Sequence, residues 1–282
     1  MKRIYFIMLT GLLVGCSQNV NLELPTPPTQ ITVDGHIEPG QLANMYLSKN
    51  IAYTTSLSIT SILAQDIIHG AKVTISDGTS TDSMREVNVK AGYYQSVTMK
   101  GQIGKTYSIS VTALGQTVTS STTILPPVPL DSAWFQVYQN LDTLGYVWAQ
   151  LTAPLPVGHC YRWLAERIGK DTLYIPPTYS AFNDALFAGQ SVTIFYNRGQ
   201  LPGSTAADDT NAESGWFKTG EKVVVKFCSI DNTAYQFYNS YYNQMYNGSN
   251  PFSSPGIVTG NIKGGQGIWC AYGSSYDTVI CK

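Results

Sequence analysis

The chain has 282 residues, and its 17 basic and 18 acidic side chains give a formal net charge of −1 at pH 7. Nucleic-acid-binding proteins usually carry a basic face, and because the sequence has no cluster of Lys or Arg, that class is excluded. Hydrophobic residues make up 43% and charged residues only 12% of the chain. Such a composition supports a buried core and excludes disorder for most of the chain.

The N-terminus has the pattern of a secretory signal. Two basic residues precede an apolar run over residues 4–14, which is too short to span a bilayer because a spanning helix takes about 20 apolar residues. The run ends in the sequence LVGC, which resembles the bacterial lipobox, whose cysteine is lipidated. We therefore expect residues 1–15 to be a signal peptide and Cys16 to carry the lipid. Two or more acyl chains anchor a protein stably, so the mature chain should stay at the membrane.

Residues 16–30 contain three prolines and little apolar periodicity, which predicts an extended tether. From residue 31 to residue 128, short β-prone runs alternate with turn signals. Asp77-Gly78 is a strong hairpin signal after the third of these runs. The pattern predicts an N-terminal antiparallel sandwich, immunoglobulin-like or transthyretin-like, with residues 57–69 as a helical turn or long loop. The expected strands cover residues 31–37, 45–48, 71–76, 86–89, 92–97, 105–113 and 116–124.

The proline-rich residues 126–129 mark the expected boundary between two domains, because all five tryptophans lie beyond them. Residues 129–282 are predicted to form a second antiparallel β domain with a polar loop over residues 200–215. The glycine-rich segment over residues 260–267 is predicted to lead into a final hairpin. Further strands are expected over residues 132–138, 143–152, 160–168, 172–175, 191–196 and 222–229.

A single helix is predicted over residues 231–246, with Asp231 as its N-cap. Tyr235, Tyr238 and Tyr242 recur at helical spacing, followed by Met245. This aromatic stripe is interpreted as the face that packs on the sheet of the second domain. The alternative is a platform on which a sugar stacks.

Four cysteines remain after Cys16, an even number in an oxidising compartment. Cys270 and Cys281 flank a short turn-like sequence, so a hairpin would pair them, and Cys160 with Cys228 would follow by elimination. The alternative is four buried free thiols that act as small hydrophobes.

No catalytic pattern is present in the sequence. It has no GxSxG, HExxH or Walker motif, and His36, His69 and His159 are scattered along the chain. We therefore expect a protein that is not an enzyme, without a catalytic residue or a cofactor. A hydrolase that uses scattered acids is the alternative.

No metal site is expected either, since the CxxC and HxxxH spacings of zinc sites are absent. Asp208, Asp209 and Glu213 offer oxygen ligands of the kind that calcium prefers. Their place in the polar loop favours a solvated loop over a calcium site.

Several motifs in series resemble the Bacteroidota lipoproteins grouped as domain of unknown function 4249 (DUF4249). They are the lipobox, the run ITVDGHI, the AKVTISDG hairpin followed by GYYQS, the TILPPVPLDS hinge, the YRW of residues 161–163 and the ending NPFSSPGIVTGNIKGGQGIWCAY. The resemblance covers nearly the whole mature chain. The sequence after Cys16, SQNVN, lacks the acidic cluster associated with surface export in that phylum.

The resemblance implies an outer-membrane lipoprotein, on the cell surface or the periplasmic face, that is not an enzyme and that assists a TonB-dependent (SusC-like) transporter. A ligand-capturing or accessory role in uptake is therefore expected. The alternative is a stand-alone carbohydrate- or peptide-binding module, since aromatic side chains stack well on sugars. Most of the tryptophans are nevertheless expected in the core; they are Trp134, Trp148, Trp163, Trp216 and Trp269.

Overall fold

The computed structural model describes residues 28–50, 66–87, 92–199, 215–247 and 257–282. From Thr29 onward these residues belong to one compact unit. The predicted signal peptide, the predicted lipid site Cys16 and most of the predicted tether lie outside the described residues. So do the acidic residues of the polar loop and most of the segment predicted as a helical turn or loop. The described part is mainly β, with one long helix, which confirms the predicted fold class.

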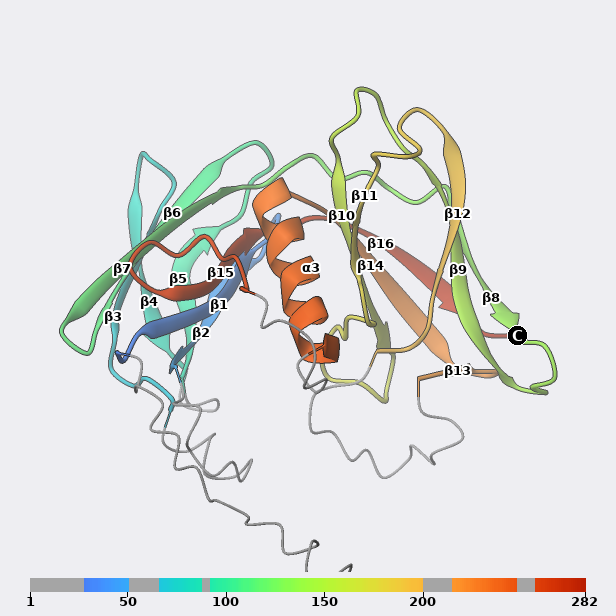
Figure 1. Ribbon diagram of the computed structural model, residues 1–282, viewed down its shortest axis with the longest axis horizontal. Helices are drawn as coiled ribbons and strands as arrows, with labels where there is room; N and C mark the ends of the chain where they lie inside the picture. Colours follow the sequence, from blue (N-terminus) through green and yellow to red (C-terminus); the bar gives the residue numbers. More distant parts are fainter. Residues whose placement is uncertain (1–27, 51–65, 88–91, 200–214, 248–256) are drawn as a thin grey trace, which may run out of the picture. The chain divides into compact units, whose positions relative to one another are not determined.

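An eight-stranded sheet encloses the first core (Figure 1). Its strands alternate buried apolar residues with polar ones, as in β1, where Ile31, Val33 and Ile37 are buried. The strand order is β15-β1-β2-β5-β4-β3-β6-β7. The bounds are β1 (Ile31–Ile37), β2 (Leu42–Lys49), β3 (Lys72–Ser76), β4 (Thr81–Glu86), β5 (Tyr93–Lys100), β6 (Thr106–Ala113), β7 (Gln116–Thr123) and β15 (Gln266–Ala271).

The two end strands of this sheet approach each other. Thr119 on β7 and Lys263, shortly before β15, exchange backbone hydrogen bonds of 3.2 and 2.8 Å. Trp269 on β15 is fully buried in the same core, and its indole N–H donates to the backbone carbonyl of Tyr107 at 3.0 Å. The sheet therefore closes around its own apolar side chains.

The C-terminal segment does not form the predicted final hairpin. β15 pairs in parallel with β1, whereas β16 (Gly273–Ile280) pairs antiparallel with β14 in another sheet. The chain crosses at Tyr272, whose backbone N–H donates to the carbonyl of Ile37 at 2.9 Å. The physical reason is that β15 is apolar on both faces. Trp269 packs in the first core and Cys270 in a different apolar cluster, so a two-stranded hairpin would expose one of them.

Two further sheets lie in the part of the chain that follows residue 128. One has the order β11-β10-β14-β16, and in the other β9 pairs with β8, β12 and β13. Apolar side chains of both sheets meet in a second core, among them Val147, Trp163 and Phe227. The bounds are β8 (Ser132–Val137), β9 (Leu144–Thr152), β10 (Cys160–Arg167), β11 (Ala181–Asn183), β12 (Ser191–Tyr196), β13 (Phe217–Lys218) and β14 (Lys222–Ile230).

The segment expected as a strand at residues 172–175 is mostly irregular in the structure. Only Ile175 forms an isolated bridge, with Ala165 on β10. The boundary expected near residue 128 falls after β7, yet β15 from the later segment belongs to the first sheet.

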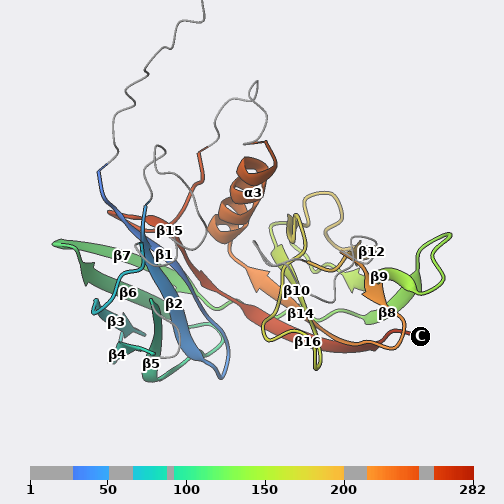
Figure 2. The ribbon, with the colours of Figure 1, turned by 90° about the horizontal axis from the view of Figure 1, so that it is seen from below.

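The predicted helix is confirmed as α3 (Asn232–Asn247). A carboxylate oxygen of Asp231 accepts the backbone N–H of Ala234 at 2.7 Å, which is the expected N-cap. Tyr238 and Tyr242 are buried, and α3 contacts β10, β11 and β15 (Figure 2). The interpretation of the aromatic stripe as a packing face is confirmed for these two tyrosines, whereas Met245 is exposed.

The four cysteines are buried free thiols, so the expected disulfides are absent from the structure. Cys160, Cys228 and Cys270 lie in the apolar cluster beside α3, whereas Cys281 lies in the second core. Cys270 lies on β15 and Cys281 directly follows β16, and these two strands belong to different sheets, which is why the hairpin argument for their pairing does not apply. Burial raises the pKa of Cys160 and Cys228 to about 11 and that of Cys281 to about 12.

Candidate functional site

The outer side of the β8-β9-β12 sheet carries a continuous aromatic surface. On β9, Val147, Ala149 and Leu151 point into the second core, so Tyr146 and Trp148, at the alternate positions, point outward. We call the following set the aromatic face: Trp134, Tyr138, Tyr146, Trp148, Phe195 and Trp216.

Strand register places three of these rings in one row. Trp134 on β8 is the direct partner of Trp148 on β9, and Trp148 is the direct partner of Phe195 on β12. The ring centroids of Trp134 and Trp148 are 6.5 Å apart with an interplanar angle of 17°. Those of Trp148 and Phe195 are 4.5 Å apart with an angle of 29°. Trp148 is therefore held between two nearly parallel rings.

The other three rings continue the face beyond Trp148. The centroid of Tyr146 lies 5.3 Å from that of Phe195 and 4.6 Å from that of Trp216. Tyr138 completes the group at 5.2 Å from Trp216. Aromatic pairs at such separations contribute about 0.5–1.5 kcal/mol each beyond their buried area. The rings therefore hold one another in place before any ligand arrives.

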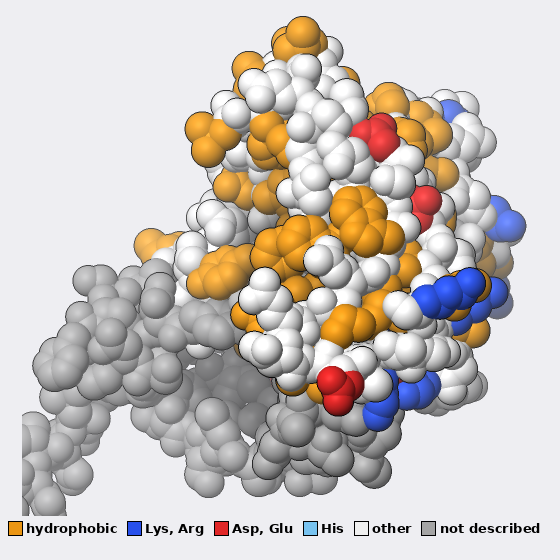
Figure 3. Space-filling view, turned by 90° about the vertical axis from the view of Figure 1, so that its right-hand side faces the viewer, with side chains coloured by type: hydrophobic (Ala, Val, Ile, Leu, Met, Phe, Trp, Pro, Cys, Tyr) orange, Lys and Arg blue, Asp and Glu red, His pale blue; other side chains and the backbone are white. Residues whose placement is uncertain are grey.

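Parts of this face remain open to solvent. Trp134 is 36%, Tyr138 49% and Phe195 50% exposed. Figure 3 views the molecule from the side on which β8, β9 and β12 lie, and hydrophobic side chains gather in the middle of the view. Large exposed apolar patches on soluble domains usually mark a binding surface.

A row of amide and hydroxyl groups runs beside the aromatic row. Gln150 on β9 is the strand partner of Ser132 and of Thr193. Its side-chain amide donates to the Ser191 hydroxyl at 2.6 Å, and its side-chain oxygen accepts the Thr193 hydroxyl at 3.0 Å. These contacts fix the amide next to the rings. The face thus combines ring surfaces with uncharged hydrogen-bonding groups.

The five tryptophans separate into two groups. Trp163 and Trp269 are fully buried, as expected, but the expectation that most of the five lie in the core is wrong. The other three, Trp134, Trp148 and Trp216, belong to the aromatic face. The contribution of Tyr138, Tyr146 and Phe195 was not anticipated, although the alternation of GYVWAQL over residues 145–151 is the signal that would have placed Tyr146 and Trp148 on one face.

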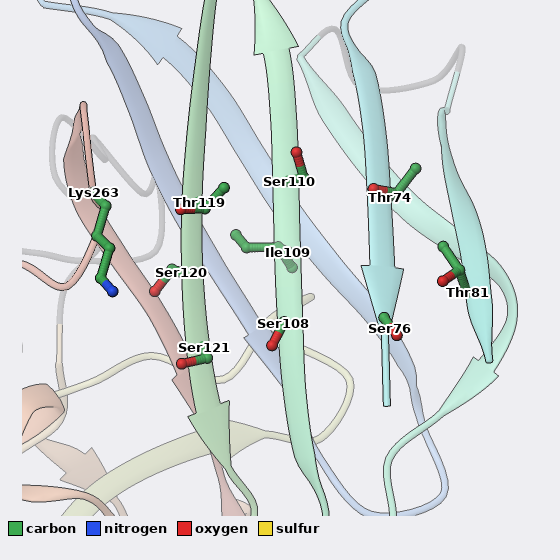
Figure 4. Close-up of a pocket in the computed structure, with 10 residues that line it drawn as sticks. All are labelled: Thr74, Ser76, Thr81, Ser108, Ile109, Ser110, Thr119, Ser120, Ser121 and Lys263. Carbon is green, nitrogen blue, oxygen red and sulfur yellow. The ribbon is translucent and has the colours of Figure 1, made fainter. Parts of the chain in front are cut away.

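A hollow lies on the outer side of the first sheet (Figure 4). Its volume is about 410 Å³, and hydroxyl side chains from β3, β4, β6 and β7 line most of it, with Lys263 at one side. Thr74, Ser110 and Thr119 form one cross-strand row there. These hydroxyl groups can hydrogen-bond to a ligand, but no aromatic ring lines the hollow.

Two of the three histidines, His69 and His159, contact a carboxylate that also accepts backbone N–H groups. Nδ1 of His69 lies 2.6 Å from Glu86, and Nδ1 of His159 lies 3.0 Å from Asp184. Glu86 and Asp184 each also accept two backbone N–H groups, which indicates a structural role. Burial and then Lys226 lower the pKa of His36 to about 4, so its ring is neutral at pH 7.

Within the described ranges, no group of three or more His, Cys, Asp or Glu residues is arranged to hold a metal ion. In the same part of the chain, no helix has both the length and the apolar character needed to cross a membrane.

A family model described as "Domain of unknown function (DUF4249)" matches residues 18–277 of this chain. No curated protein matches the chain. Among solved structures, a two fibronectin type-III domain segment from chicken tenascin is 11% identical, with a TM-score of 0.22. The match covers 73% of this chain and 93% of that chain. A similarity of this size carries no argument about function.

Proposed function

We propose that this protein, which belongs to the DUF4249 family, is a lipid-anchored, non-enzymatic protein that captures a neutral carbohydrate on its aromatic face for a TonB-dependent transporter. The observation that carries the proposal is the row of Trp134, Trp148 and Phe195 beside the fixed amide of Gln150.

The chemistry of the face favours a carbohydrate. Sugars present apolar C–H groups on one side and hydroxyl groups around their edge. Exposed rings such as Trp134 and Phe195 cover the apolar side, and Gln150 with Thr193 offers donors and acceptors to the hydroxyl groups. Because the six rings and the Gln150 row carry no charge, the proposed ligand is neutral.

The preformed arrangement of the face also supports this role. Side chains that are ordered before binding lose little conformational entropy when a ligand arrives, so more of the contact energy appears as affinity. Trp148 is held between its neighbours, and Gln150 is held by Ser191 and Thr193. A face of this kind binds without reorganisation.

The membrane location and the transporter partner belong to the same proposal. The lipobox ending in Cys16 supports an anchor at the outer membrane, and a captured ligand would then be held close to a transporter. Replacing Cys16 with Ala should release the protein from the envelope fraction and abolish labelling by fatty acid. A variant that still sediments with envelopes would count against the anchor.

Binding of neutral polysaccharides to the full mature lipoprotein in mild detergent tests the carbohydrate assignment. Trp134→Ala and Phe195→Ala should each weaken binding about tenfold or more, which corresponds to about 1.4 kcal/mol. Tyr46→Ala is the matched control, because Tyr46 is 41% exposed on β2, away from the aromatic face. Unchanged binding in a variant that carries both Trp134→Ala and Phe195→Ala, or binding of peptides alone, would overturn the assignment.

Co-purification tests the transporter separately. The tagged lipoprotein, extracted in mild detergent, should bring down an outer-membrane transporter, and the Trp134→Ala variant should do so equally well. A pull-down without any transporter would reject the partnership and leave the carbohydrate assignment standing.

A further inference from the structure

A polar groove of about 660 Å³ lies apart from the aromatic face, where β2 and β5 meet residues of β16 and of the loop after β10. Asn44 on β2 and Gln95 on β5 are direct strand partners and line the groove. Tyr174 and Tyr276 line it from the other side, with ring centroids 6.1 Å apart. A volume of this size falls in the range of small-molecule sites.

A buried carboxylate lies at the groove, and its charge is already compensated. Glu38 is 8% exposed and Lys226 4% exposed, and the two side chains form an ion pair at 2.7 Å. Glu38 also accepts the hydroxyl groups of Ser274 at 2.8 Å and Tyr276 at 3.1 Å. Because its oxygens are occupied in this way, Glu38 forms a fixed part of the groove wall. Together with Lys226 it adds no net charge to the groove.

Two other lining groups are available to a ligand. Among the described residues, the ammonium group of Lys100 has no ion-pair partner, and the hydroxyl of Tyr174 has no hydrogen-bond partner. Burial raises the pKa of Tyr174 and Tyr276 above the usual value, so both remain neutral donors at pH 7. His36, which lies 3.9 Å from Glu38, contributes no charge at pH 7 either. Among the described residues that line the groove, Lys100 therefore carries the one uncompensated charge. The carboxylate of Glu166 is near Tyr174 and also raises its pKa, but Glu166 does not line the groove.

We propose that this groove is a second binding site, for a small polyhydroxylated carboxylate of which a hexuronate is the simplest. Lys100 faces the carboxylate, while the Asn44 amide and the Tyr174 hydroxyl bind the sugar hydroxyl groups. The ring of Tyr174 covers the apolar side of the sugar. The site is independent of the aromatic face, because the two share no residue.

Calorimetric titration of the full mature lipoprotein in mild detergent with glucuronate and galacturonate tests the proposal, with glucose as the neutral comparison. We expect uronate binding that weakens with added salt, because Lys100 is exposed and its interactions are screened. Lys100→Met should weaken uronate binding about tenfold or more, and Tyr174→Phe should weaken it several-fold. Lys222→Met is the matched control, since Lys222 is also exposed and lies on β14 away from the groove.

Any one of three results would overturn the proposal. They are the absence of uronate binding, glucose binding as tight as uronate binding, and uronate affinity that is unchanged in Lys100→Met. Trp134→Ala should leave uronate binding intact, so the two sites can fail separately. A thermal unfolding curve for each variant shows that it is folded before it is titrated.

Discussion

The side-chain ammonium of Lys226 lies 2.7 Å from a carboxylate oxygen of Glu38, a residue 188 positions earlier in the chain. Glu38 directly follows β1 in the first sheet, whereas Lys226 lies on β14 in a different sheet. Both residues are buried, so their charges are removed from water and depend on each other. The rings of Tyr174 and Tyr272 lie 5.2 Å from the same ammonium group.

Breaking this ion pair should destabilise the fold strongly. Lys226→Met leaves the Glu38 carboxylate buried without its cation, which typically costs about 3–5 kcal/mol. The double variant Glu38→Met with Lys226→Met removes both charges and should recover most of that loss. Urea denaturation of the three proteins measures the free energy of unfolding. A double variant as unstable as the single one would contradict this account.

The N-cap of α3 also ties the helix to the first sheet. One carboxylate oxygen of Asp231 accepts the Ala234 N–H, and the other accepts the Thr122 hydroxyl at 3.1 Å. Asp231→Ala should cost about 0.5–2 kcal/mol for the cap alone, and Asp231→Asn, which keeps an acceptor oxygen, should cost less. Thermal unfolding of both variants measures the difference. Equal losses would show that the charge matters and the cap geometry does not.

The sequence predicted best those elements whose own pattern determines them. The alternation of β1 and the spacing of Tyr238 and Tyr242 on α3 gave the correct element and the correct buried face, because side-chain periodicity follows backbone geometry. The strand β4, TDSMRE, has little apolar alternation and was placed too late in the chain. Its strand character depends on pairing with β3 and β5, which the local sequence does not encode.

Long-range pairing explains the other differences. β15 is apolar at adjacent positions, and nothing in the local sequence indicates that its partner is β1, more than two hundred residues away. The aromatic face was predictable only in part for the same reason. Trp134, Trp148 and Phe195 become neighbours through the register of three strands, which composition cannot supply.

A fall in pH should weaken the hydrogen bonds that Glu86, the last residue of β4, accepts from neighbouring backbone N–H groups. Glu86 accepts the N–H groups of Gly70 and Gly92 and contacts His69, and these interactions, led by the Gly70 hydrogen bond, lower its pKa to about 2. Because the folded-state pKa lies below the ordinary value of 4.5, ionised Glu86 stabilises the fold above about pH 4.5. That stability is lost as the pH falls from 4.5 toward 2.

The variant Glu86→Gln isolates this effect. Its free energy of unfolding should lie below that of the natural protein at pH 6, and the gap should shrink steadily as the pH approaches 2. Chemical denaturation at several pH values measures the gap. A difference that stays constant over this range would rule out the titration of Glu86 as its source.

The four buried thiols should be unreactive in the folded protein. Burial raises the pKa of Cys160, Cys228 and Cys281 to about 11 or 12 and that of Cys270 well above its ordinary value, so almost no thiolate forms at pH 8. The thiolate is the reactive species, and burial also blocks access of a reagent. A thiol reagent should therefore label none of these four in the native protein and all four in urea.

A Cys16→Ala background removes any contribution from the proposed lipid site to this measurement. In that background, four labelled thiols in urea without a reducing agent would agree with the free cysteines of the structure. If only two thiols or none were labelled, and all four were labelled after reduction, disulfides would form in the natural compartment. Mass spectrometry of the labelled peptides would then identify the paired residues. A Cys270–Cys281 disulfide would contradict the structure, in which β15 and β16 lie in different sheets.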